Sequence, residues 1–278
     1  MRPRLRIGRL LIGAGRLIQS FGIYIHRLGK SSQTMAVMVM KPDDLVELNR
    51  EFYSGSKMVK FYCNKDLVNS GLNHDEKAIL RMIPLKTGKL LLLGLGGGRE
   101  AIYLSRKGFD VTGVDFVPEM INKTKKYAAS HGVKIKGIVQ EISNLDLALG
   151  SYDIIWLSSA TYSSIPTKER RINILHKIKK ILKNKGYFVC SFSFDKKFSA
   201  YSPIRELLKK AFTIISLGSF WYEKGDIIWR NSEFHHIFSS NEQLSSEFKS
   251  GGFEIIQVNI PDNPSDWSLA LLRKRIPD

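Results

Sequence analysis

Glycines and a nearby aspartate form the most distinctive group of chemically useful residues in this sequence. A leucine run ends at Leu93, the stretch GLGGG occupies residues 94–98, and a second apolar run ends at Asp115. Glycine has no Cβ, so such a turn can adopt positive φ values and let a ligand approach its backbone. The pattern differs from the dinucleotide fingerprint, because Arg99 stands where the third glycine of that fingerprint belongs. No Gly-Lys-Ser or Gly-Lys-Thr follows, which excludes a P-loop.

The elements that must hold this turn alternate between strands and helices. The apolar strand segments are continuous runs, which indicates a sheet covered on both faces. Repeated strand–helix–strand units predict a doubly wound, mostly parallel α/β sheet with right-handed crossovers. In such a sheet the ligand lies beyond the carboxyl ends of the strands, where the strand order reverses. The predicted strands lie at 89–93, 109–114, within 133–140, 152–157 and 186–194, and the predicted helices at 100–107, 118–131 and 167–182.

Around these residues the sequence resembles the class I S-adenosylmethionine-dependent methyltransferases, over about residues 50–275. The resemblance implies a Rossmann-like seven-stranded sheet with an antiparallel last strand and S-adenosylmethionine as cofactor. In this family the glycine turn receives the methionine part and the ribose, and an acid at the end of the second strand accepts hydrogen bonds from both ribose hydroxyls. A carboxylate suits a vicinal diol because its oxygens offer about four lone-pair sites. The implied cofactor-binding residues are Gly94, Gly96, Gly98, Asp115 and Glu141, the last facing the exocyclic amine of adenine.

The methyl acceptor is expected over the end of the fourth strand, in the segment IIWLSSATYSSIP. The resemblance implies in-line displacement at the sulfonium methyl, for which the protein chiefly supplies position, desolvation and, where needed, a base. His236 and Tyr162 are the candidates for that base, and Tyr53 is a candidate for closing over the cofactor. The predicted acceptor-binding residues are Trp156, Ser158, Tyr162 and Trp221.

Two residues of the glycine turn depart from the family pattern. An acid often stands two places before the first glycine, where it helps to orient the turn or the cofactor's amino group; this chain has Leu92 there. Leu95 occupies a position that cysteine or alanine often holds. Both changes are compatible with the fold, but Leu92 leaves open the alternative of a non-catalytic member that only binds the cofactor.

Positive charge is concentrated ahead of the predicted sheet. The formal net charge is +17, and no acidic residue precedes Asp43. Apolar residues at steps of three and four in residues 1–34, with arginines on another face, predict a basic amphipathic helix that could lie on an anionic membrane surface. There are three alternatives: the segment packs on the protein's own body, it is an organelle-targeting peptide, or translation starts at Met35, Met38 or Met40.

The predicted organisation has three parts. A basic amphipathic segment at 1–34 is followed by a helical lead-in at 35–86 that covers the cofactor site, and by the methyltransferase domain at 87–278. An insert at 195–240 is rich in aromatic residues. Cys63 and Cys190 match neither a zinc spacing nor a disulfide framework, so we expect no metal site and a cytoplasmic location, with peripheral membrane contact through residues 1–30 left open.

The sequence therefore predicts S-adenosylmethionine-dependent methyl transfer to a small-molecule or lipid-like acceptor. An RNA methyltransferase is the alternative that the charge favours, and a non-catalytic cofactor-binding protein is the other. The tetrapeptides with Pro-Pro followed by Tyr or Phe, which mark many amino-directed nucleic-acid methyltransferases, are absent. Their absence argues against methylation of the amino groups of adenine or cytosine.

Overall fold

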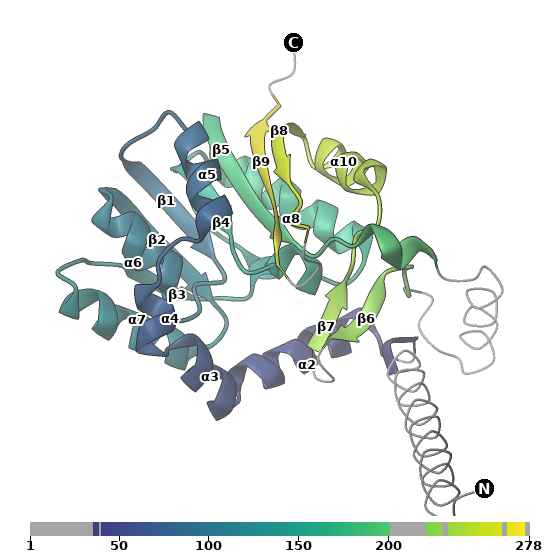
Figure 1. The fold of residues 1–278 in the computed structure, drawn as a ribbon, viewed down its shortest axis with the longest axis horizontal. Helices are drawn as coiled ribbons and strands as arrows, with labels where there is room; N and C mark the ends of the chain where they lie inside the picture. Colours follow the sequence, from purple (N-terminus) through teal and green to yellow (C-terminus); the bar gives the residue numbers. More distant parts are fainter. Residues whose placement is uncertain (1–35, 39, 201–220, 230–232, 263–265, 276–278) are drawn as a thin grey trace, which may run out of the picture.

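The computed structural model describes residues 36–38, 40–200, 221–229, 233–262 and 266–275. Its centre is a seven-stranded sheet with the order β3-β2-β1-β4-β5-β9-β8 (Figure 1). The first five strands in this order run parallel, and β9 lies antiparallel between β5 and β8. The strands are β1 (Gly88–Leu93), β2 (Phe109–Asp115), β3 (Lys136–Val139), β4 (Tyr152–Leu157), β5 (Leu182–Phe192), β8 (Phe253–Asn259) and β9 (Ser268–Lys274). The predicted fold class, with its antiparallel last strand, is confirmed.

Helices cover both faces of this sheet. Leu90 and Leu92 of β1 pack in one core cluster with residues of α5, α6 and α7, whereas Leu91 and Leu93 pack in another with residues of α8 and α10. Burial on both faces explains why β1 is apolar at all four of these positions. These helices are α5 (His74–Met82), α6 (Arg99–Arg106), α7 (Pro118–Ser130), α8 (Lys168–Ile181) and α10 (Asn241–Ser250).

The predicted boundaries hold to about one residue for most of these elements, and β5 is the main exception. It begins at Leu182, whereas the prediction placed its start at 186. Leu182 pairs with Tyr152, and the register then shifts before Ile154 pairs with Tyr187. Leu182 is buried, but the added residues 183–185 are polar and exposed, so the apolar pattern did not reveal this part of the strand.

The first three helices of the lead-in and part of the insert lie together at one end of the sheet (Figure 1). The lead-in contains α2 (Pro42–Ser54), α3 (Ser56–Tyr62), α4 (Lys65–Asn69) and α5, and the insert contributes the hairpin of β6 (Asp226–Trp229) and β7 (Glu233–His236). The side chain of Asn49 in α2 joins the lead-in to this hairpin by two hydrogen bonds. Its Nδ2 donates to the carbonyl of Phe234 at 3.3 Å, and its Oδ1 accepts from the N–H of Phe234 at 2.7 Å. Three short 3₁₀ helices lie at Ile142–Asn144, Thr161–Ser164 and Lys196–Ala200.

Two sequence predictions fall largely outside the described residues. The basic amphipathic segment at 1–34 and the part of the insert at 201–220 both lie there. Within the described part of the chain, none of the helices is long and apolar enough to cross a membrane.

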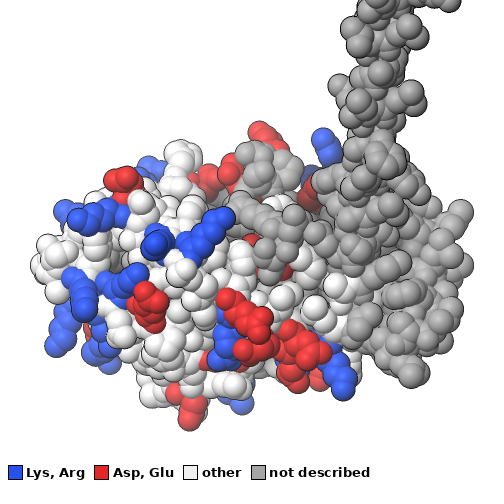
Figure 2. Space-filling view, turned by 90° about the horizontal axis from the view of Figure 1, so that it is seen from below, with Lys and Arg blue, Asp and Glu red and all other residues white. Residues whose placement is uncertain are grey.

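Charge is unevenly distributed over the surface in Figure 2. Seen from below, Lys and Arg side chains gather on the side where α6 and α7 lie, and acidic side chains are more frequent towards the middle of the face. This face thus carries both basic and acidic groups, so it does not support the alternative of an RNA-binding surface.

Candidate functional site

A cavity of about 410 Å³ lies at the carboxyl ends of β1, β2 and β4. Strand β1 has β2 on one side and β4 on the other, so this is the point where the strand order reverses. Doubly wound sheets bind ligands at this point. Residues of α2, α3 and α4, which belong to the predicted lead-in, also line the cavity.

The glycine turn forms one wall of the cavity. Gly94 and Gly96, with φ values of +80° and +51°, both line it, and so does Gly97. A methyl group added at Gly96 would meet only a ring carbon of Tyr62, at 3.8 Å. The turn therefore leaves open space above Gly96, where a ligand can approach the backbone.

Gly98, a predicted cofactor-binding residue, is not among the residues that line the cavity, whereas Gly97 is. A methyl group at Gly98 would lie 2.4 Å from Cγ2 of Thr124, so this glycine allows the turn to pack on α7 and does not line the cavity. A methyl group at Gly97 would lie 1.9 Å from the carbonyl oxygen of Tyr62. Gly97 is thus required for the close approach of α3, a contact between distant segments that the sequence does not reveal.

Asp115 lines the same cavity and also shapes the glycine turn. Its Oδ2 accepts a hydrogen bond from the N–H of Gly96 at 2.8 Å, and its Oδ1 accepts one from the N–H of Val117 at 2.9 Å. Burial raises the pKa of Asp115, and these backbone donors oppose that effect. A carboxylate has about four acceptor sites, so these backbone donors do not occupy all of them.

Glu141 lies at the cavity too, together with the apolar side chains of Phe116, Met120 and Ile142. Its carboxylate accepts hydrogen bonds from Ser143, from the N–H at 3.0 Å and from the hydroxyl. Glu141 thus lies at the cavity, and its oxygens accept from Ser143 at the start of a 3₁₀ helix.

Tyr53 of α2 lines the cavity from above and connects it to β7. Its ring centroid lies 5.9 Å from that of Tyr62 and 6.3 Å from that of Phe116. Its hydroxyl donates to the carboxylate of Glu233, which is 5% exposed. Burial is the main reason why the pKa of Tyr53 is raised. Tyr53 is therefore fixed over the cavity, where the sequence predicted a closing residue.

The predicted acceptor contacts after β4 require correction. Trp156 is completely buried in the core between the sheet and α5–α7, so it has no access to the cavity. Ser158 is also buried, and its hydroxyl donates to the carbonyl of Gly94 at 2.7 Å, which makes it a support of the glycine turn. Ser159 and Thr161 line the cavity in their place.

Tyr162 and Trp221 also lie away from the cavity lining. Tyr162 is completely buried, and its hydroxyl donates to Oε2 of Glu247 at 2.8 Å. It therefore cannot serve as the predicted base or acceptor contact. Trp221 is 54% exposed and is not part of the cavity wall. Trp267, which the sequence did not single out, does line it.

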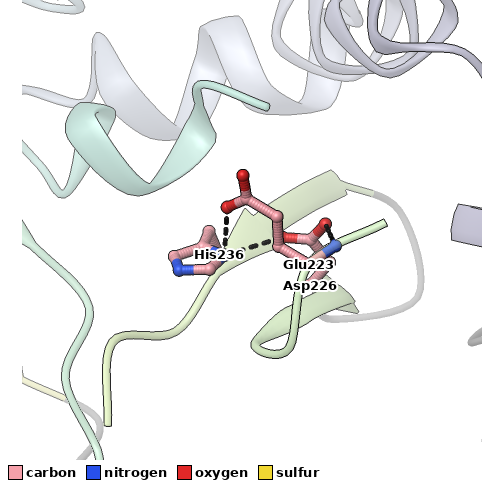
Figure 3. A group of neighbouring side chains, drawn as sticks. All are labelled: Glu223, Asp226 and His236. Carbon is pink, nitrogen blue, oxygen red and sulfur yellow. Dashed lines mark hydrogen bonds and ion pairs between the residues drawn. The ribbon is translucent and has the colours of Figure 1, made fainter. Parts of the chain in front are cut away.

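His236, the other predicted base, belongs to a buried polar group on the β6–β7 hairpin. Figure 3 shows Glu223, Asp226 and His236 facing one another. Nδ1 of His236 lies 2.7 Å from Oδ1 of Asp226 and 3.8 Å from Oε2 of Glu223. Burial lowers the pKa of His236 to about 3, with the positive charge of Arg171 as a second cause. His236 is not among the residues that line the cavity, so it is not placed to act there as a base.

The same group has donor atoms of the types that bind metal ions, all within 4.8 Å of one another. However, the guanidinium of Arg171 already lies 2.7 Å from Oε2 of Glu223 and 2.8 Å from Oε1 of Glu247. Arg171 thus supplies positive charge to this group, and the hydrogen bonds among its members account for their positions.

Known proteins share this architecture. A family model described as a methyltransferase domain matches residues 90–186. The ubiquinone biosynthesis O-methyltransferase of Xylella fastidiosa (strain 9a5c) is 31% identical over 67 residues, which cover 24% of this chain and 27% of that protein. The uncharacterized methyltransferase YodH of Bacillus subtilis (strain 168) is 28% identical over 119 residues, which cover 43% of this chain and 49% of that protein. The chain thus spans at most about half the length of these curated relatives.

A solved structure agrees in fold over most of the chain. The 1,6-didemethyltoxoflavin-N1-methyltransferase of Burkholderia thailandensis, with bound 1,6-didemethyltoxoflavin and S-adenosylhomocysteine, has a TM-score of 0.59 and 15% identity. The similarity covers 86% of this chain and 92% of that one. The strand order, the glycine turn and the match to a methyltransferase domain over residues 90–186 make this chain similar to the class I S-adenosylmethionine-dependent methyltransferases.

Proposed function

We propose that this protein binds S-adenosylmethionine in the cavity beside the glycine turn and transfers its methyl group to a small-molecule acceptor. The observation that carries the proposal is the position of Asp115. Its carboxylate ends β2, holds the glycine turn by the N–H of Gly96, and lines a cavity beside the open space above that glycine. The acceptor sites that remain on its oxygens suit the two hydroxyls of a ribose.

The residues present fit the parts of this cofactor. Phe116, Met120 and Ile142 offer an apolar surface for the adenine next to the ribose-binding carboxylate. When bound, S-adenosylmethionine supplies an electrophilic methyl group on a sulfonium centre. The protein's contribution is to position that methyl group and the acceptor and to exclude water, so a dedicated base is not obligatory.

The other part of the cavity suits a small acceptor. Asn49, Tyr53, Ser159, Ile165 and Trp267 line it, a mixture of apolar surface and a few polar groups. The volume of the whole cavity, about 410 Å³, lies within the range of roughly 300–1,000 Å³ that is common for small-molecule sites. The predicted cytoplasmic location and the contact of residues 1–30 with an anionic membrane remain predictions from the sequence.

Calorimetric titration of the full chain tests the cofactor assignment. We expect S-adenosylhomocysteine to bind with one site per chain and NADPH to show no binding, because Arg99 replaces the third glycine of the dinucleotide fingerprint. Incubation with cofactor labelled on its methyl group and a small-molecule extract should then yield a labelled product. Binding of NADPH without S-adenosylhomocysteine would refute the proposal, and binding without any methyl transfer would favour the non-catalytic alternative.

A further inference from the structure

Three charged side chains form a nearly buried group next to the glycine turn. Arg99 and Glu100 begin α6, and Glu76 comes from α5 in the lead-in. An NH2 atom of Arg99 lies 2.6 Å from Oε1 of Glu76 and 2.7 Å from Oε1 of Glu100. Glu76 and Glu100 are 5% and 3% exposed. Two carboxylates therefore share one guanidinium, which leaves one negative charge without a matching cation among the described residues.

The uncompensated charge belongs to Glu100. Both oxygens of Glu76 are bonded by Arg99, and its Oε2 also accepts from the N–H of Asn73 at 2.7 Å. Glu100 receives a single contact from Arg99. Burial raises the pKa of Glu100, the positive charge of Arg99 opposes this, and the negative charge of Glu76 adds to it. A buried carboxylate in this situation favours a proton or a cationic partner.

Glu100 is also open to the ligand cavity. It lines that cavity together with Gly96 and Gly97 of the turn and with Asn73 of the lead-in. Glu100 is therefore among the residues that a cation inside the cavity would meet.

The acid that often stands two places before the first glycine in this family is missing here. Leu92 occupies the position, and its side chain is completely buried in the core with Leu90 and Trp156. The strand before the turn thus offers no carboxylate to a ligand, and the first residues of α6 offer one.

We propose that Glu100 binds the α-ammonium group of the cofactor's methionine part, in place of the acid that Leu92 lacks. Arg99 is a positioning residue, because it holds Glu100 at the cavity and ties both to Glu76. The bound ammonium would balance the excess negative charge that Arg99 leaves on Glu76 and Glu100, and Arg99 would keep its place. This inference rests on the proposed function and adds to it the residue that recognises the amino-acid end of the cofactor.

Two ligands that differ only in the amino-acid end separate this role from a structural one. In calorimetric titrations, E100Q should bind S-adenosylhomocysteine at least about tenfold more weakly than the wild type. Its affinity for 5′-methylthioadenosine, which has the nucleoside but no ammonium group, should stay within about twofold of the wild-type value, since no charged contact is lost. Unchanged binding of S-adenosylhomocysteine, or equal losses for both ligands, would overturn the inference.

The controls keep this result distinct from the proposed function itself. E169Q changes an exposed acid in the first turn of α8 and should leave both affinities unchanged. E100Q keeps an acceptor for Arg99 and removes a buried charge, so its thermal unfolding temperature without ligand should not fall. The wild type should bind the analogue of S-adenosylhomocysteine that lacks the amino group at least about tenfold more weakly than S-adenosylhomocysteine itself. Equal affinities for these two ligands would contradict the inference, and this test needs no variant. Failure of the wild type to bind either nucleoside would instead refute the proposed function.

Discussion

Replacement of Arg171 by methionine is expected to lower the free energy of unfolding by about 3–5 kcal/mol, because it leaves a buried carboxylate without its partner. Arg171 is completely buried, and its Nε and NH2 atoms donate to Glu247 at 2.9 and 2.8 Å. Glu247 is itself completely buried. Arg171 also pairs with Glu223 at 2.7 Å, so the substitution affects the contacts of α8 with both α10 and the segment before β6.

Urea denaturation monitored by circular dichroism measures this effect, and the adjacent residue provides the control. Arg170 pairs with Asp43, whose side chain is 86% exposed. Exposed pairs contribute about 0–1 kcal/mol, so R170M should change the free energy of unfolding by no more than that. Similar losses in the two variants would show that the buried network does not stabilise the fold as described.

The G97A variant is expected to lose at least about tenfold in affinity for S-adenosylhomocysteine and about 1–3 kcal/mol in the free energy of unfolding. The added methyl group would lie 1.9 Å from the carbonyl oxygen of Tyr62 and 2.6 Å from its carbonyl carbon. These are backbone atoms, so a change of side-chain rotamer cannot relieve the contact. The end of α3 must move away from the glycine turn, and Tyr62 lines the cavity that this movement would open.

G150A is the matched control for the glycine substitution. Nothing lies within 4 Å of a methyl group at Gly150, and its φ of +60° implies a strain of about 1–2 kcal/mol for alanine. This variant should lose some stability and keep its affinity for S-adenosylhomocysteine, as measured by calorimetry. If G97A kept wild-type affinity, the close packing of α3 on the turn would not be required for the site.

The fold and the cofactor side of the site could be predicted because they depend on local patterns. Continuous apolar runs identified the buried strands, and the order of strands and helices allowed few topologies. Asp115, Gly94, Gly96 and Glu141 reach the cavity because the carboxyl ends of neighbouring parallel strands necessarily meet there. The position of these four residues along the chain was therefore sufficient to predict that they lie at this edge of the sheet.

The acceptor side could not be predicted, because it depends on the direction of side chains. Ser159 and Ala160 adopt φ values of +50° and +55°, so the chain reverses sharply after β4. That reversal directs Ser159 and Thr161 to the cavity, whereas Tyr162 is buried against α10. A sequence shows that this segment is polar and aromatic, but it does not show which way each residue faces.

Long-range ion pairs were equally hidden. Arg99 and Glu76 are 23 residues apart and meet only because α5 packs beside the glycine turn. In the sequence, Arg99 was visible only as a departure from the dinucleotide fingerprint.

His235 and His236 are neighbours on a strand, so their side chains point to opposite faces of it. Both are buried, because the hairpin that carries them has protein on both sides.

The most direct test of the account is a calorimetric titration of S-adenosylhomocysteine against wild type, D115A and D110N. Asp115 and Asp110 lie at opposite ends of β2, and Asp110 is an exposed residue that pairs with Lys136 at 3.8 Å. The account predicts a loss of at least about tenfold for D115A, or about 1.4 kcal/mol, and wild-type affinity for D110N. Wild-type affinity in D115A would contradict the assignment of this carboxylate to the cofactor's ribose.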